Sequence, residues 1–125
     1  MARSTSFSNI TPKSLQYLAP HLPTGAQQSL SGAGAINVTS YCTKWTTTGA
    51  NAGTLANGTV EGQLKKIQMI VDAGDGTLTP TNLAAGTTIT FNDVGDFALL
   101  QWKNGEWHVL EMGNDADGAT GPVLA

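Results

Sequence analysis

Few side chains in this sequence have the chemistry of a catalytic or metal-binding group, and they are widely spaced. The cysteine is Cys42, and the two histidines are His21 and His108. A thiol and an imidazole can act as nucleophile and base, but no nucleophile motif surrounds Cys42, and a small buried thiol is the commoner case. A structural zinc site is hard to build from these residues at this spacing. The pattern therefore predicts no enzyme and no metal centre, and a small hydrolase using Cys42 or His108 is the weakest hypothesis.

Aspartates next to glycines are the second set of candidate ligands: Asp72, Asp75, Asp93 and Asp96. Residues 72–76 lack the ligand spacing and the closing glutamate of an EF-hand calcium loop. Aspartate caps tight turns, and glycine supplies the positive φ that such turns need. The glycines at 32–34 lack the following Lys-Ser/Thr of a phosphate-binding loop. We therefore expect turns at these places and no cofactor.

The elements that would have to position such groups are strands, and the clearest is a hairpin over residues 96–111. Asn104-Gly105 between two alternating segments favours a two-residue type I′ turn, because both residues tolerate positive φ. A loop of this length also fixes the register of the two strands. The predicted pairs are Lys103–Glu106, Trp102–Trp107, Gln101–His108, Leu100–Val109 and Leu99–Leu110.

Both faces of this hairpin are apolar. One face carries Trp102, Trp107, Leu100 and Val109, and the other carries Phe97, Leu99 and Leu110. An antiparallel hairpin with one solvent-exposed face alternates between apolar and polar residues. Because this hairpin is apolar on both faces, we expect other parts of the protein or another subunit to pack on each of them. One cover is the core of the same subunit. The other is a second layer or a neighbouring copy of the chain, and the pattern leaves open which face is core and which is subunit interface.

The rest of the chain divides into an arm, a β-domain and a tail. We expect residues 1–33 to form an extended arm with one short helix, about 12–19, which Thr11-Pro12 starts and Pro20 ends. The alternative is a disordered leader, which seldom carries a cluster of apolar residues such as that at 15–22. Residues 34–113 contain short strands separated by turns, which predicts an all-β fold, an antiparallel β-sandwich or small barrel. Residues 114–125 are assigned to a C-terminal tail. The arm residues expected to contact a partner are Leu15, Tyr17, Leu18 and Leu22.

Two further predictions concern single strands. In residues 63–71, alternation places Lys65 on the same side as Ile67 and Met69, and we expect Lys65 to lie at the start of the strand, where its charge reaches solvent. Residues 77–79 are expected to form a short edge strand, because Pro80 stops it.

Charge limits the possible partners. Charged residues make up 12% of the chain and the net charge is -3, whereas about a quarter of an average soluble domain is charged. The basic residues form no stripe that follows a phosphate backbone, so no nucleic acid is expected. No apolar run reaches membrane-spanning length and the first residues lack the apolar core of a signal peptide. We therefore expect synthesis in a cytoplasm, no membrane partner, and a weakly charged surface that neighbouring copies cover.

Most of the chain from about residue 25 onward resembles a module of tailed-bacteriophage structural proteins. The segments that carry the resemblance are 32–36, 55–67, 72–83, 86–96, 99–102 and 105–110. Similar modules occur in capsid decoration (cement) proteins, head fibres and tail appendages of phages and large aquatic viruses. The resemblance implies a β-rich, usually trimeric module without enzymatic activity.

The resulting hypothesis is a virion structural protein made in the host cytoplasm. As a capsid decoration protein on the capsid surface, a homotrimer would bind the major capsid protein through its arm and stabilise the phage head. The alternative is a head-fibre or tail-appendage tip that binds host-surface glycan. The aromatic residues available for such a platform are Trp45, Trp102, Trp107, Tyr17 and Tyr41. The short chain, without shaft repeats or a long coiled coil, favours the first hypothesis.

Overall fold

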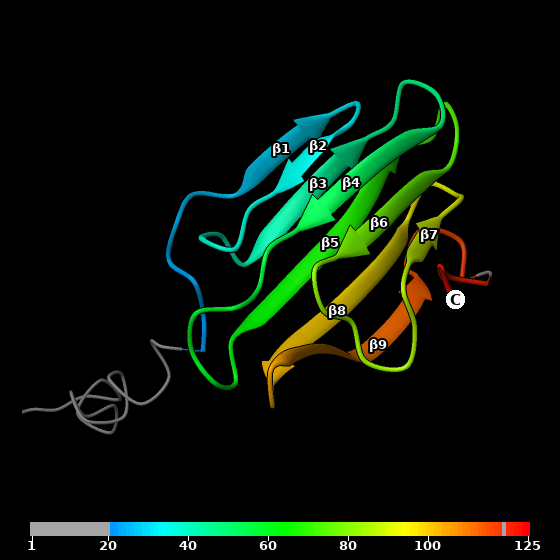
Figure 1. Cartoon of the computed structure of the whole chain (residues 1–125). Helices are drawn as coiled ribbons and strands as arrows, with labels where there is room; N and C mark the ends of the chain where they lie inside the picture. Colours follow the sequence, from blue (N-terminus) through cyan, green and yellow to red (C-terminus); the bar gives the residue numbers. More distant parts are fainter. Residues whose placement is uncertain (1–20, 119) are drawn as a thin grey trace, which may run out of the picture.

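The computed structural model describes residues 21–118 and 120–125, and within them the chain forms strands and no helix (Figure 1). The all-β prediction is confirmed for this part, while the predicted helix at 12–19 lies outside the described residues. None of the described residues forms a helix long and apolar enough to cross a membrane. The strands are β1 (Gln28–Ser31), β2 (Gly34–Ile36), β3 (Cys42–Thr46), β4 (Asn51–Leu55), β5 (Leu64–Val71), β6 (Gly76–Pro80), β7 (Ile89–Phe91), β8 (Asp96–Lys103), β9 (Glu106–Asn114) and β10 (Val123–Leu124).

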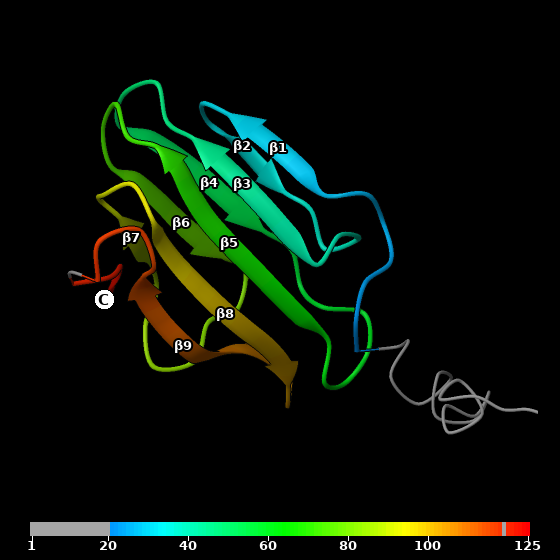
Figure 2. The same cartoon turned by 180° about the vertical axis from the view of Figure 1, so that it is seen from behind.

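The strands form two five-stranded sheets that lie over one another (Figures 1 and 2). The first sheet has the order β1-β3-β5-β8-β9, and the second has the order β10-β7-β6-β4-β2. The prediction of antiparallel pairing throughout is wrong, because both sheets are mixed. β1, β3 and β5 run parallel, as do β2, β4 and β6, whereas β8 and β9 in the first sheet and β7 and β10 in the second pair antiparallel.

The parallel pairs arise because the chain alternates between the two sheets as far as β6. Each of the pairs β1–β2, β3–β4 and β5–β6 makes one turn of a wide coil with one strand in each sheet. Successive turns stack, so equivalent strands run in the same direction. Two kinds of turn have the same composition, rich in Gly, Asn and Asp. One kind reverses the chain within a sheet, and the other carries it to the opposite sheet. Turn composition alone therefore did not reveal the coil.

The sheets extend past both predicted boundaries of the β-domain, 34 and 113. β1 lies in the predicted arm, where Gln28 pairs with Thr43, and β10 lies in the predicted tail, where Leu124 pairs with Ile89. The side chain of Gln28 fixes β1 to its neighbours. Its Oε1 accepts hydrogen bonds from the hydroxyl of Thr43 at 2.8 Å and from the Asn37 N–H at 2.9 Å. The described remainder of the arm, residues 21–27, is called the arm root below.

The segment predicted to be an edge strand, 77–79, lies instead in the middle of the second sheet. Its strand, β6, pairs with β4 on one side and with β7 on the other. Pro80 is the last residue of β6, where the missing N–H interrupts the ladder least. The proline therefore ends the strand without placing it at an edge.

The core lies between the sheets and is anchored by two tryptophans. Trp45 and Trp107 have no exposed surface, and their Nε1–H groups donate to Gly32 O at 2.8 Å and to Ala56 O at 2.9 Å. Trp45 of the first sheet meets Phe91 of the second edge-on, with ring centroids 5.8 Å apart. The ring contact joins the two layers, and the hydrogen bonds pair both buried indole N–H groups. A buried N–H group without a partner would cost about 1–3 kcal/mol.

The hairpin predicted over residues 96–111 is the β8–β9 pair. Asn104 has φ 55° and Gly105 has φ 79°, as a two-residue type I′ turn requires. The register confirms four of the predicted pairs, which are Lys103–Glu106, Trp102–Trp107, Gln101–His108 and Leu100–Val109.

The fifth predicted pair of the hairpin, Leu99–Leu110, is wrong. The register shifts after Leu100–Val109, so that Leu99 lies opposite Glu111 and Leu110 is the extra residue of a β-bulge. A bulge leaves one residue unpaired and bends its strand. The alternation of apolar and polar residues assumes a strict two-residue period, so it does not reveal where a bulge inserts an extra residue.

Candidate functional site

The structure assigns the two faces of the hairpin. Leu100 and Trp107 have no exposed surface, and Trp102 and Val109 pack against the core. The rings of Trp102 and Trp107 meet edge-to-face with centroids 5.4 Å apart. This face belongs to the core of the subunit. Phe97 and Leu99, which alternate with the buried residues of β8, therefore point away from the second sheet.

The outer face of the first sheet is a candidate contact surface. Figure 2 looks onto this face, and none of the described strands lies over it. Its side chains are long and half-buried: Lys44 of β3, Leu64, Lys66 and Gln68 of β5, Phe97, Leu99 and Gln101 of β8, and His108 of β9. Lys66 Nζ lies 5.2 Å from the centre of the Phe97 ring. The centre of the face is thus apolar, with cationic side chains among its neighbours.

Leu110 adds to this apolar surface at the edge of the sheet. The bulge places it opposite Leu99 together with Glu111, and 48% of its surface is exposed. β9 is the outermost strand of the first sheet, so this edge also carries unpaired backbone groups. Because a bulge interrupts the regular ladder, the edge is a poor template for adding a further strand. The face, rather than the edge, is the better contact surface.

The outer face of the second sheet has a different chemistry. Its side chains are short and uncharged: Ala35 of β2, Ala52 and Thr54 of β4, Thr77 and Thr79 of β6, and Thr90 of β7. In register they form the rows Ala35–Thr54–Thr79 and Ala52–Thr77–Thr90. Short threonine and alanine side chains offer little apolar area. The two outer faces of the molecule are therefore not equivalent.

The arm root is fastened to one end of the first sheet. The Leu64 N–H donates to His21 O at 2.7 Å, and the Gly25 N–H donates to Thr39 O at 2.8 Å. Of the predicted arm contacts, Leu22 is 41% exposed, and the other three, Leu15, Tyr17 and Leu18, lie outside the described residues. The first described residues are therefore held at a fixed point of the β-domain.

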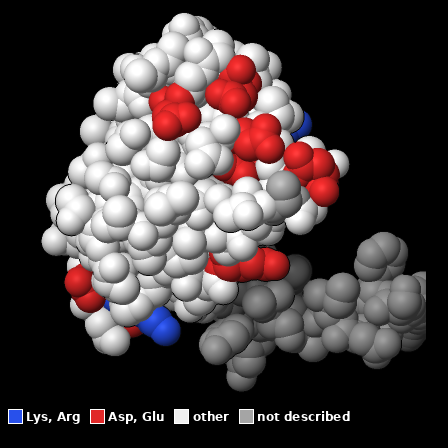
Figure 3. All heavy atoms as spheres, turned by 90° about the vertical axis from the view of Figure 1, so that its right-hand side faces the viewer, with Lys and Arg blue, Asp and Glu red and all other residues white. Residues whose placement is uncertain are grey.

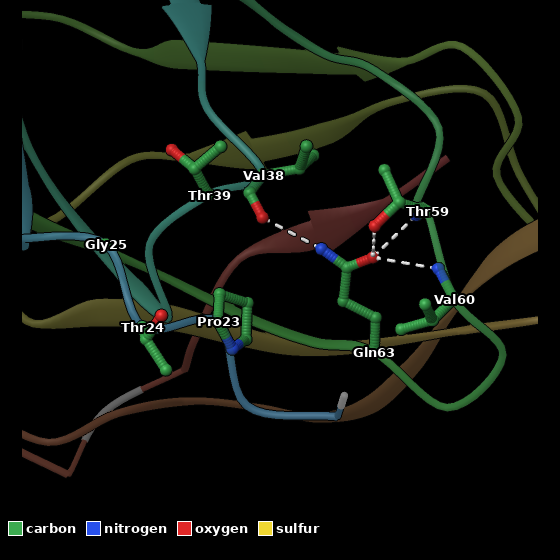
Figure 4. A pocket seen from close by; sticks show the side chains of 8 residues that line it. All are labelled: Pro23, Thr24, Gly25, Val38, Thr39, Thr59, Val60 and Gln63. Carbon is green, nitrogen blue, oxygen red and sulfur yellow. Dashed lines mark hydrogen bonds between the residues drawn. The ribbon is translucent and has the colours of Figure 1, made fainter. Parts of the chain in front are cut away.

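A pocket of about 430 Å³ lies beside the arm root (Figure 4). Gln63 is its polar centre, but the amide is engaged: Nε2 donates to Val38 O at 2.8 Å, and Oε1 accepts the Thr59 N–H at 2.6 Å. The pocket thus offers a ligand few unpaired polar groups, and its residues mainly connect the arm root to the neighbouring loops. The lining residues are Pro23, Thr24, Gly25, Val38, Thr39, Thr59, Val60 and Gln63.

Lys65 departs most from the sequence-based expectation. It was predicted to reach solvent, but it has no exposed surface. Its Nζ donates to Ser40 O at 3.0 Å, to Ser40 Oγ at 3.0 Å and to Asn37 Oδ1 at 3.4 Å. All three acceptors are neutral oxygens. Burial lowers the pKa of Lys65 to about 8, against a smaller opposing effect from Cys42.

The signal for this burial was present in the sequence. Alternation along residues 63–71 already placed Lys65 on the side of Ile67 and Met69, and both are fully buried. The prediction failed because a lysine is almost never fully buried without partners, and nothing in the sequence showed that the turn at 37–40 would supply the oxygens. The cluster of Lys65, Ser40 and Asn37 was therefore missed.

The structure does not bring Cys42 and His108 together. Cys42 lies on β3 and His108 on β9, with β5 and β8 between them, a separation of three strand spacings or about 14 Å. His108 Nε2 is buried and has no hydrogen-bond partner among the described residues. These two residues therefore do not form the nucleophile and base of the weakest hypothesis.

The aspartates act as turn residues where their contacts are seen. Asp72 Oδ1 accepts the Gly74 N–H at 3.0 Å, and Asp96 accepts the Asn92 N–H at 2.9 Å and Asn114 Nδ2–H at 3.0 Å. Among residues 21–118 and 120–125, no group of three or more side chains is arranged to hold a metal ion. In Figure 3, most of the visible side is neither basic nor acidic, and basic side chains form no stripe on it.

The aromatic platform of the glycan hypothesis is largely inside the protein. Trp45 and Trp107 are fully buried, and Trp102 packs on the core beside Gly58, where a Cβ would overlap the indole. Tyr41 is half-buried, and Tyr17 lies outside the described residues. Trp45 and Trp107 therefore present no ring surface to a sugar, and Trp102 is half-buried against the core.

No protein-family model matches this sequence, and no curated protein matches it. The fold and the candidate sites define a class in general terms. The chain is a two-layer all-β protein with one apolar outer face, a fastened N-terminal arm root and a buried lysine cluster.

Proposed function

We propose that this protein is a capsid decoration (cement) protein, a virion structural component that assembles as a homotrimer. Copies associate through the outer face of the first sheet, and the N-terminal arm binds the major capsid protein. The observation that supports this proposal best is the outer face of β8, where Phe97 and Leu99 remain half-exposed although the opposite face of the same hairpin forms the core.

The size of this face permits modest contacts between copies. Five strands span about 19 Å, and eight residues of strand span about 26 Å, which gives roughly 500 Å² per copy. In a trimer the face of each copy is shared between two neighbours, so three copies together would bury about 1,500 Å², or roughly 500 Å² at each pairwise contact, which is small for a single specific interface. Each apolar side chain that becomes fully covered contributes up to about 1.5–3 kcal/mol. A trimer repeats this contact around its axis, so weak individual contacts combine.

Attachment to a capsid is assigned to the arm because the arm root is fastened and the arm residues are apolar. The His21 and Gly25 backbone groups hold the root on the β-domain. The arm then provides apolar side chains whose burial against a partner surface would stabilise the complex. These side chains are Leu15, Tyr17 and Leu18. A decoration protein needs both parts, a β-domain that associates with copies of itself and an arm that adds contacts to the capsid.

Deleting residues 2–20 is expected to abolish capsid binding while leaving the β-domain and its oligomer intact. The deletion retains His21, whose carbonyl accepts the Leu64 N–H. Binding to purified capsids that lack the protein is measured by co-sedimentation, together with the solution mass and melting temperature of the truncated protein. A loss of at least tenfold in affinity, or about 1.4 kcal/mol, with unchanged mass and melting supports the arm assignment.

Full-length protein with Val94→Ser serves as the matched control, because Val94 is an exposed apolar side chain in the turn before β8, outside the arm. Full occupancy of capsids by the truncated protein would show that the arm assignment is wrong. The glycan-binding tip is tested separately by antibody labelling of virions. Uniform labelling of the head supports decoration, whereas label confined to the tail rejects it.

A further inference from the structure

The Lys65 cluster joins a buried amine to the carboxamide of Asn37, which is half-buried. Asn37 lies just after β2, Ser40 three residues later, and Lys65 on β5, so the cluster connects a turn to the middle strand of the first sheet. Ser40 and Lys65 have no exposed surface. Asn37 Oδ1 accepts from the Ser40 N–H at 3.1 Å, the Ser40 hydroxyl at 2.6 Å and Lys65 Nζ at 3.4 Å. Three donors at one atom identify it as the oxygen of the amide and fix its orientation.

We propose that Lys65 and Asn37 form an intramolecular isopeptide bond. Nζ of Lys65 bonds to Cγ of Asn37, the Cγ–Nδ2 bond breaks, and the nitrogen leaves as ammonia. The amine and the primary amide become a secondary amide plus ammonia, so the exchange needs no oxidant, reductant or cofactor. The bond links two residues of the same chain and does not join one copy of the protein to another.

The amide carbon is within reach of the amine. Nζ lies 3.4 Å from Oδ1, and a C=O bond is about 1.23 Å long, so Nζ is at most about 4.6 Å from Cγ. Reaction requires an approach to about 3–3.5 Å, so Nζ must move by about 1 Å from the position in which it donates to Oδ1. Lys65 is fully buried and Asn37 is half-buried, so their surroundings hold both groups in place and limit the access of water as a competing nucleophile.

The Ser40 donors activate the amide. When Nζ attacks, negative charge develops on Asn37 Oδ1, and the Ser40 N–H and hydroxyl already point at this atom. Preorganised donors of this kind stabilise a tetrahedral intermediate. Ser40 Oγ also accepts from Lys65 Nζ at 3.0 Å. The hydroxyl can therefore take a proton from the attacking nitrogen while it donates its own to Oδ1. When the intermediate collapses, Oδ1 gives up this proton and the departing nitrogen takes one up, so that it leaves as ammonia.

The amine must be neutral to attack, and its surroundings favour that form. Burial lowers the pKa of Lys65 to about 8, with Cys42 as the titratable group that opposes this shift. The fraction of neutral amine rises tenfold with each pH unit below the pKa and saturates above it. We therefore expect the rate of bond formation to rise with pH up to about 8 and to become constant above that value.

Intact mass spectrometry of the denatured full chain tests the proposal. Protein held at pH 9 is expected to weigh about 17 Da less than its sequence mass, once any removal of Met1 is allowed for, because ammonia is lost. Trypsin is then expected to release a branched peptide that joins residues 14–44 to residues 45–66. Lys65→Met and Asn37→Ala should each retain the full mass, and Ser40→Ala should slow the loss at least tenfold.

Lys66→Met is the matched control, because Lys66 is the neighbouring lysine but lies on the outer face over Phe97, and it should lose ammonia like the wild type. Succinimide formation at Asn57-Gly58 or Asn104-Gly105 also removes ammonia. That product would persist in Lys65→Met and would give no branched peptide. Folded wild-type protein with unchanged mass after prolonged incubation at pH 9, or the same branched peptide from folded Asn37→Ala, would overturn the proposal.

Discussion

Replacing Trp107 by alanine is expected to lower the free energy of unfolding by about 3–5 kcal/mol, the range for truncating a large buried aromatic side chain. Trp107 has no exposed surface and packs edge-to-face on Trp102. Its indole N–H also donates to Ala56 O at 2.9 Å, a contact between the hairpin and the segment after β4. Because a domain of this size is stable by only about 5–15 kcal/mol, a large share of the protein should unfold at moderate denaturant concentration.

Urea denaturation followed by tryptophan fluorescence and circular dichroism measures this loss. Trp107→Phe is the matched variant, because it keeps a ring in the core and removes the N–H that pairs with Ala56. We expect it to cost about 1–3 kcal/mol, chiefly from the unpaired carbonyl and the lost volume. A Trp107→Ala cost below about 1 kcal/mol, typical of an exposed site, would contradict the assignment of this hairpin face to the core.

Replacing Leu99 by glutamate is expected to dissociate the oligomer into folded monomers. Leu99 lies on the outer face of the first sheet, between Lys66 of β5 and Glu111 of β9 in the register. In a subunit contact its carboxylate would be buried near the equivalent groups of the next copy, and its desolvation would cost more than an ion pair with the neighbouring Lys66 returns. In an isolated subunit the same carboxylate remains in water, so the stability of the monomer should change by about 1 kcal/mol or less.

Thr79→Glu provides the matched control for this substitution. Thr79 is exposed on the outer face of the second sheet, and a charge there should leave the oligomer unchanged. Native mass spectrometry across a dilution series distinguishes the variants, and circular dichroism verifies that both fold. If Leu99→Glu retains the wild-type mass while Thr79→Glu dissociates, the second sheet rather than the first forms the contact.

The parts of the fold that local chemistry determines were predictable from the sequence. Asn104-Gly105 specifies a turn through the φ values that the two residues tolerate, and the turn then fixes four cross-strand pairs. The bulge at Leu110 was not predictable in this way. It depends on how β9 bends over the core, which is a property of the packed sheet rather than of neighbouring residues.

The order and direction of the strands were the part of the fold that the sequence predicted least. The coil of β1 to β6 places Gln28 beside Thr43 and Thr43 beside Ile67, contacts that no local pattern reports. Alternation shows which residues face the core but not which sheet a strand joins. Lys65 illustrates the same limit, because alternation placed it inward correctly while its partners, Ser40 and Asn37, come from a distant turn. Both the mixed sheets and the lysine cluster required the three-dimensional arrangement.

The mass of the purified full-length protein in solution tests the central claim most directly. Light scattering coupled to size-exclusion chromatography measures it at near-neutral pH and moderate salt. We expect three times the chain mass of 12.9 kDa, because the apolar outer face of the first sheet is covered by further copies. A mass equal to that of one chain at high protein concentration would contradict self-association through this face.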